Sequence, residues 1–252
     1  MGESKSSFKY ILIIGFIIIF LVVGFFIAKS FLPAGVLSKK PTVHNAVYEC
    51  TNDNSISSKG YVYLHGLGDH NPGILNDIKA LINQDPILDF DYNEKLLLNE
   101  ISNDFILQFS KFASQNNFEE IVIIGQSAGG VIASFSAHQL NFNGVIELHT
   151  LASPINGYHV SDKFLGELSG FAREIGEGFD SFTKPGNNFK IYHHKTVVDE
   201  DLSSLCGEFA KFCSPLSIQD NNIEGSNDFY YSEYDHTSIM PAVSKMIIEC
   251  HN

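Results

Sequence analysis

Ser127 stands between two glycines, Gly125 and Gly129, in the pattern Gly-x-Ser-x-Gly. The residues before it, Ile121–Ile124, form an unbroken run of β-branched side chains, which is typical of a strand buried on both faces of a parallel sheet. Val131–Leu140 follows and is long enough to form a packed helix. The pattern therefore predicts a tight strand-to-helix turn that projects the serine hydroxyl as a nucleophile.

A dinucleotide-binding turn is the alternative reading, since it also consists of a strand, a glycine-rich loop and a helix. Here, however, the residue between Gly125 and Gly130 is Ser127, where the dinucleotide motif needs a glycine that lets the backbone approach a pyrophosphate. The segment also lies in the middle of the chain instead of at the start of a domain. We therefore favour the nucleophilic serine.

A second loop with chemical potential follows the β-rich run Gly60–Leu64 and reads His-Gly-Leu-Gly-Asp over residues 65–69. Its glycines allow a sharp turn that would direct the N–H of Leu67 toward a reacting carbonyl oxygen. The N–H of Ala128, directly after the serine, would supply the second donor. We expect these two groups to form an oxyanion hole, with an ordinary surface loop as the alternative.

The sequence also contains a general base and an orienting acid at suitable places. His236 follows the last predicted strand, Asp228–Ser232, and Asp199 follows the preceding one, Phe189–His193. A histidine accepts the serine proton, and a carboxylate orients the imidazole and stabilises its charged form. We predict Asp199 as the acid, with Asp201 in the same loop as the alternative.

The elements that would position these residues alternate between helix and strand. This alternation predicts an α/β fold with a mostly parallel sheet, helices on both faces, and ligands at the carboxyl ends of the strands. The further elements expected are a helix over Pro72–Gln84, a strand over Lys95–Asn99, a helix over Ser102–Asn116, a strand over Gly144–Leu151 and a helix over Ile239–Cys250.

Residues 157–188 read as an insertion with an amphipathic helix, because apolar residues recur in it every three or four positions. We expect a small helical cap in which Phe164 and Phe171 contact an apolar part of the substrate. His65 and Gly66 would line the same pocket. A crossover helix packed on the sheet is the alternative.

The N-terminal part differs in kind from the rest. Tyr10–Ala28 carries no charge, and as a helix it would measure about 28 Å, close to the hydrocarbon thickness of ~30 Å. We predict a transmembrane signal anchor, with a cleaved secretory signal as the alternative. Residues 1–9 would be a tail, 29–42 a linker, and 43–252 the globular domain.

The cysteines and the charge bear on the compartment and the partners. Four cysteines lie beyond the predicted anchor, which favours an oxidising compartment and an extracytoplasmic domain, periplasmic, lumenal or extracellular. We expect pairs Cys50–Cys250 and Cys206–Cys213, with four free thiols as the alternative. The net charge of −13 argues against a nucleic-acid partner. No spacing of histidine, cysteine and carboxylate matches a metal site.

From about Tyr61 to Cys250 the chain resembles the α/β-hydrolase superfamily, with the chain order serine, acid, histidine. His-Gly-Leu-Gly-Asp is similar to acyl-protein thioesterases, whereas Leu-Ala-Ser-Pro at 151–154 is similar to lipases. The resemblance implies an α/β-hydrolase fold and a serine hydrolase that needs no cofactor. Its substrate would be a carboxylic ester or thioester with a hydrophobic, lipid-like acyl group. An amidase or peptidase and a non-catalytic binding domain are the alternatives.

Overall fold

The computed structural model describes residues 48, 58–68, 72–82, 85–155, 170–177, 182–183, 185–196 and 223–251. The predicted anchor and linker, Asp199, Asp201, Phe164 and most of the predicted cap lie outside these ranges and stay predictions. Within the described part of the chain, no helix has the length and apolar character needed to cross a bilayer.

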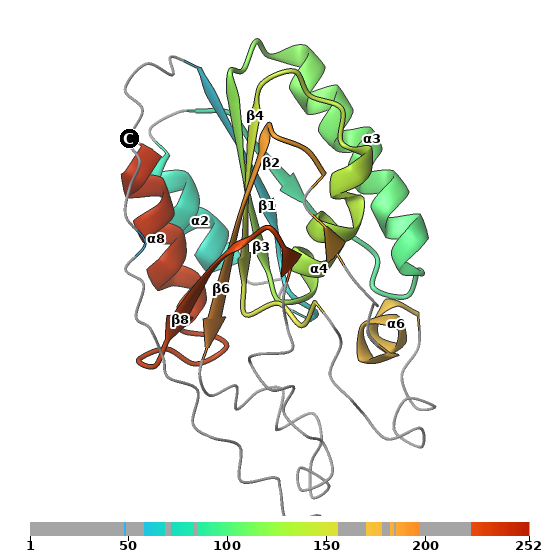
Figure 1. The fold of residues 1–252 in the computed structure, drawn as a ribbon, viewed down its shortest axis with the longest axis vertical. Helices are drawn as coiled ribbons and strands as arrows, with labels where there is room; N and C mark the ends of the chain where they lie inside the picture. Colours follow the sequence, from blue (N-terminus) through green and yellow to red (C-terminus); the bar gives the residue numbers. More distant parts are fainter. Residues whose placement is uncertain are drawn as a thin grey trace, which may run out of the picture. The chain divides into compact units, whose positions relative to one another are not determined.

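A six-stranded sheet forms the centre of the domain (Figure 1). Every pair of neighbouring strands described in it is parallel, which confirms the predicted sheet. In spatial order its strands are β2 (Ile87–Phe90), β1 (Lys59–Leu64), β3 (Glu120–Gln126), β4 (Val145–Leu151), β6 (Phe189–Thr196) and β8 (Asn227–Tyr231).

Helices cover both faces of this sheet, as predicted. Helices α2 (Pro72–Leu81) and α8 (Ile239–His251) lie on one face, and α3 (Leu98–Gln115) and α4 (Ala128–Ser136) lie on the other (Figure 1). A 3₁₀ turn, η1 (Ala137–Gln139), continues α4.

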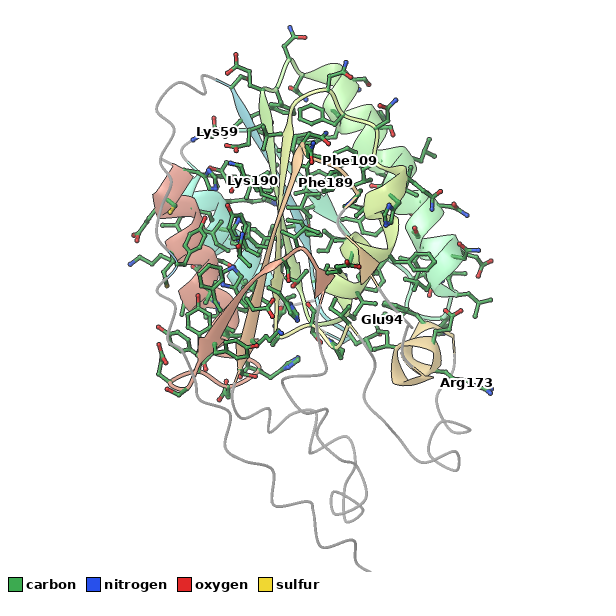
Figure 2. The ribbon with its side chains drawn as sticks, in the orientation of Figure 1. Lys59, Glu94, Phe109, Arg173, Phe189 and Lys190 are labelled. Carbon is green, nitrogen blue, oxygen red and sulfur yellow. The ribbon has the colours of Figure 1, made fainter. Side chains whose placement is uncertain are left out.

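The unbroken apolar run in β3 serves two hydrophobic cores at once. Because side chains alternate along a strand, Ile121 and Ile123 belong to the core with α3 and α4, whereas Val122 and Ile124 belong to the core with α2 and α8. Phe109 of α3 and Phe189 of β6 are part of the first core (Figure 2). Burial on both sides explains why this strand shows no polar alternation.

The predicted strand Lys95–Asn99 is wrong. The strand in this region is β2, and helix α3 already begins at Leu98. Carboxylates satisfy the first backbone donors of the helix: Glu100 accepts from the Leu97 N–H at 3.0 Å, and Glu174 accepts from the Leu98 N–H at 2.5 Å. This capping starts the helix earlier than the predicted Ser102, which is buried inside it.

The described part of the predicted cap contains a short helix, α6 (Phe171–Glu177), and a short strand, β5 (Phe182–Thr183). Strand β5 pairs with β7 (Ile223–Glu224) in a separate two-stranded sheet. Helix α6 is held against the start of α3, since the Phe171 N–H donates to the Leu96 carbonyl at 2.8 Å.

Of the four cysteines, Cys250 lies within the described residues. It is buried and disulfide-bonded, and its partner lies outside the described ranges. The pairing with Cys50 therefore stays a prediction.

Replacing Phe105 by alanine should destabilise the domain by about 3–5 kcal/mol, because the fully buried ring packs between Phe90 and Phe109. The change in the free energy of unfolding would be measured by urea denaturation. Leu107 on the same helix is exposed, so Leu107→Ala is the control and should change stability by about 0.5 kcal/mol or less. Equal effects of the two changes would contradict the described packing.

Candidate active site

All strands of the large sheet run in the same direction, so the loops at their carboxyl ends share one edge. His65 follows β1, Ser127 follows β3, Ala152 follows β4, and His236 comes in the loop after β8. Asp199 and Asp201 lie beyond the end of β6, outside the described residues. The fold thus brings the loops that carry His65, Ser127 and His236 to one edge.

Ser127 has an unusual backbone conformation, with φ 47° and ψ −117° at the junction of β3 and α4. Its N–H donates to the carbonyl of Leu151 at 2.8 Å. The residue is partly exposed although its neighbours Gln126 and Ala128 are buried. The predicted strand–turn–helix is confirmed, and strain at a partly exposed serine is typical of a functional turn.

The glycines around Ser127 are required by close backbone contacts. A Cβ on Gly125 would lie 2.6 Å from the Cα of Gly130. A Cβ on Gly129 would overlap the carbonyl oxygen of Leu64 and lie 2.6 Å from that of His65. Glycine at both positions therefore lets the turn pack tightly against helix α4 and the end of β1.

Gly129→Ala should destabilise the domain by at least about 3 kcal/mol and abolish activity, because the overlapping atoms are backbone and cannot rotate away. Thermal unfolding and ester turnover would measure this. Gly186→Ala is the matched control, since its new Cβ would meet only the end of the Asn188 side chain, at 3.3 Å. Wild-type stability of the Gly129 variant would rule out the described approach of α4 to β1.

The predicted oxyanion loop lies directly against the serine: a Cβ on Gly66 would be 3.2 Å from the Cβ of Ser127. Gly68 has a φ of 69°, a conformation that favours glycine. Ala128 is the first residue of α4, so its N–H has no acceptor one turn earlier in the helix. The roles of Leu67 and Ala128 as oxyanion donors remain predictions.

The loop after β2 supports the predicted oxyanion loop from the other side. The hydroxyl of Tyr92 donates to the His65 carbonyl at 3.0 Å, and the two rings stack with centroids 4.4 Å apart. Glu94 accepts a hydrogen bond from the Gly68 N–H at 2.5 Å. His65 is buried in this arrangement. This support was not predicted, because strand β2 has no clear pattern in the sequence.

A second strained residue lies beside the serine. Ala152 has a φ of 46°, which alanine seldom adopts, and its N–H donates to the His194 carbonyl at 2.8 Å. Ser153 is fully buried, and its hydroxyl occupies the space that a side chain on Gly130 would need. No glycine marks this bend, so the sequence pattern carried no signal for it.

His236 is half-buried in a loop that is ordered by its neighbour Asp235. The Oδ1 atom of Asp235 accepts from the Ser238 N–H at 2.7 Å and from the Thr237 N–H at 3.1 Å. The Ser238 hydroxyl also donates to this oxygen, at 2.7 Å. This hydrogen bond has the largest effect on the carboxyl group, and together with the others it lowers the pKa of Asp235 to about 2. The carboxylate is therefore ionised at neutral pH and fixes the turn that carries the histidine.

Phe171 has no solvent exposure and packs in the hydrophobic core, with its ring centroid 5.9 Å from that of Tyr92. Phe171 is therefore a core residue and does not line an open pocket, which agrees with the alternative of a packed helix in this segment. The pocket roles predicted for His65 and Gly66 fit their place beside the serine and stay predictions.

Comparisons with known proteins identify the fold. No family model and no curated protein sequence matches the chain. Among solved structures, lipase BlEst2 from Bacillus licheniformis matches with a TM-score of 0.55 at 11% identity, covering 78% of this chain and 91% of that one. An Agrobacterium vitis S4 protein described as a hydrolase matches with a TM-score of 0.52 at 11% identity, covering 77% and 88%. The chain has the α/β-hydrolase fold, as the resemblance implied.

Proposed function

We propose that this chain is a membrane-anchored serine hydrolase that cleaves a carboxylic ester or thioester with a hydrophobic acyl group. The observation that carries the proposal is the strained, partly exposed backbone of Ser127 at the end of β3. The glycine loop packed against it supports the same conclusion. The solved structures with this fold include a lipase, which agrees with ester chemistry.

In this mechanism the Oγ of Ser127 attacks the substrate carbonyl carbon while His236 takes the hydroxyl proton. The resulting oxyanion accepts hydrogen bonds from the N–H groups of Leu67 and Ala128. The imidazolium returns its proton to the leaving alcohol or thiol, and an acyl-enzyme remains. Water then attacks the acyl-enzyme with His236 again as the base, which releases the acid and restores Ser127.

The sheet order supports this pairing of Ser127 with His236. Strands β4 and β6 separate β3 from β8, so the axes of β3 and β8 lie about 14 Å apart. The pairing is supported by the position of both residues at the carboxyl edge of the same sheet.

We assign the orienting acid to Asp199, which follows β6, the strand between β4 and β8 in the sheet. Asp199→Asn should lower kcat by about 10⁴-fold, because an amide leaves the imidazole in the wrong tautomer. Asp201→Asn is the matched variant in the same loop and should leave kcat nearly unchanged. The reverse order of the two effects would transfer the role to Asp201.

The membrane part of the proposal rests on the uncharged run Tyr10–Ala28. A single-pass anchor would hold the domain near lipid on the extracytoplasmic side, and disulfide-bonded Cys250 agrees with an oxidising compartment. Protease added to intact cells should then cut the globular domain, whereas protection until the cells are lysed would contradict this orientation.

The test of the proposed chemistry is a panel of p-nitrophenyl esters from acetyl to palmitoyl, together with acyl thioesters and acyl amides. We expect kcat/KM to rise with acyl length for esters or thioesters, and amides to react far more slowly. Preferential cleavage of amides would favour the amidase or peptidase alternative. Binding of the acyl compounds by the folded protein without turnover would indicate a binding domain.

A further inference from the structure

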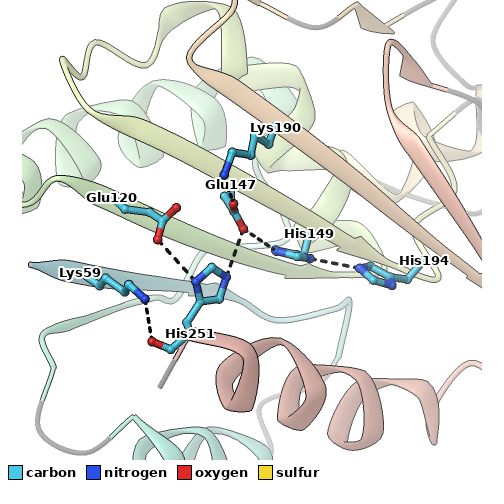
Figure 3. A network of polar contacts seen from close by, with 7 residues as sticks. All are labelled: Lys59, Glu120, Glu147, His149, Lys190, His194 and His251. Carbon is cyan, nitrogen blue, oxygen red and sulfur yellow. Dashed lines mark hydrogen bonds and ion pairs between the residues drawn. The ribbon is translucent and has the colours of Figure 1, made fainter. Parts of the chain in front are cut away.

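A buried polar cluster lies between the C-terminal end of helix α8 and strand β4 (Figure 3). Glu147 and His149 are two residues apart on β4, so their side chains share the face that α8 covers. His251, the last residue of α8, meets them there. Glu147 precedes the carboxyl end of β4 by about 13 Å, so this cluster is separate from the surroundings of Ser127.

Three potential ligand atoms converge in this cluster. The Nε2 atom of His251 lies 3.1 Å from Oε2 of Glu147, and the Nε2 atom of His149 lies 3.6 Å from the same oxygen. All three atoms lie within 4.8 Å of one another. A tetrahedral zinc ion with bonds of about 2.0–2.1 Å holds its ligand atoms roughly 3.4 Å apart. The two nitrogen–oxygen distances in the cluster, 3.1 and 3.6 Å, lie on either side of this value.

The Nε2 atom of His149 is buried and makes no hydrogen bond within the described residues, which suggests that it binds a group the chain itself does not supply. The side chain of His149 has no solvent exposure, and Nε2 makes no hydrogen bond within the described part of the chain. Its distance of 3.6 Å from Glu147 is too long for a hydrogen bond. A fully buried polar atom that makes no hydrogen bond is costly, and this one points toward the two other ligand atoms.

The other nitrogen of each imidazole has a partner that suits metal binding. Nδ1 of His251 lies 3.4 Å from a carboxylate oxygen of Glu120. Nδ1 of His149 lies 3.1 Å from Nε2 of His194, and Nδ1 of His194 lies 3.0 Å from the Tyr231 hydroxyl. When each Nδ1 carries the proton, it donates to its partner and leaves the Nε2 lone pair for a metal. Such second partners are typical of metal-binding histidines.

The carboxylate of Glu147 has one oxygen facing the two imidazoles. Lys190 lies 2.6 Å from Oε1 of Glu147, which leaves only Oε2 for a metal.

We propose that Glu147, His149 and His251 bind one divalent transition-metal ion of the zinc type, with water in the fourth position. Two imidazole nitrogens and one carboxylate oxygen form a donor set that zinc commonly takes. The ion would join the end of α8 to the middle of β4 and so act as a structural clamp. Because the cluster is remote from Ser127, the ion takes no part in the ester chemistry.

The test uses the full-length chain in detergent, expressed without a histidine tag and stripped of metal with a chelator. Zn²⁺ would be titrated in competition with a chromophoric chelator, and Co²⁺ would be added separately to record its absorption. We expect one Zn²⁺ per chain, a tetrahedral Co²⁺ spectrum and a higher Tm with zinc. His251→Gln should weaken zinc binding by at least about 100-fold, and Glu120→Gln by about 10- to 100-fold.

His138 is exposed on the 3₁₀ turn after α4, so His138→Gln is the matched control and should bind zinc as the wild type does. Circular dichroism would establish that the His251 variant is folded. A folded wild type that binds no Zn²⁺ would overturn the proposal. Unchanged zinc affinity of the His251→Gln protein would overturn it as well.

Discussion

Replacing Ser127 by alanine should lower kcat for ester hydrolysis by about 10⁴- to 10⁶-fold, because the acyl-enzyme can no longer form. The fold should be retained, since the change removes only the Oγ of a partly exposed residue. Burst and steady-state kinetics with the best p-nitrophenyl ester would measure the loss.

Ser114→Ala is the matched control for this change. Ser114 is exposed on α3, where its hydroxyl donates to the Lys111 carbonyl, and its removal should leave kcat unaltered. If the folded Ser127 variant keeps a substantial fraction of wild-type turnover, another group performs the attack and the proposed mechanism is wrong.

Replacing His236 by alanine should cost about 10⁴-fold or more in kcat, because no other group then accepts the serine proton. The double variant with Ser127→Ala should be no slower than the worse single variant, since the two residues act as one unit. If the kcat of the double variant is lowered by the product of the two single losses, the two side chains act independently.

His138→Ala is the control for a histidine change, because His138 is exposed beyond the end of α4. Its kcat should equal that of the wild type. A similar loss in both histidine variants would point to a general effect on folding instead of a role in proton transfer.

The sequence predicted the region around Ser127 well because several local signals agree there. The β-branched run in β3 is buried on both faces, and the glycines on either side of the serine meet backbone atoms that exclude a side chain. These requirements act over neighbouring residues, so the sequence pattern records them. The prediction that the site lies at the carboxyl edge of the sheet followed from the alternation of strands and helices.

The start of α3 was predicted incorrectly because its capping depends on a distant residue. Glu174 lies on α6 and caps the helix at Leu98, which no local pattern around Leu98 reveals. The strand β2 was missed since its short segment, Ile-Leu-Asp-Phe, is interrupted by an acidic residue. The strained Ala152 likewise depends on contacts with strands from other parts of the chain.

The polar cluster between α8 and β4 illustrates the same limit for function. Glu147 and His149 are close in the sequence, but His251 joins them only because the last helix packs on the sheet. Sequence spacing therefore predicted no metal site. The assignment of the orienting acid rests on chain order alone, because Asp199 and Asp201 lie outside the described residues.

The most direct test of the central claim is to label the full-length protein with a fluorophosphonate and map the modified residue by mass spectrometry. We expect one phosphonylated residue, Ser127, and no labelling of the Ser127→Ala variant. Labelling of a different residue, or no labelling of folded wild-type protein that still hydrolyses esters, would contradict the claim.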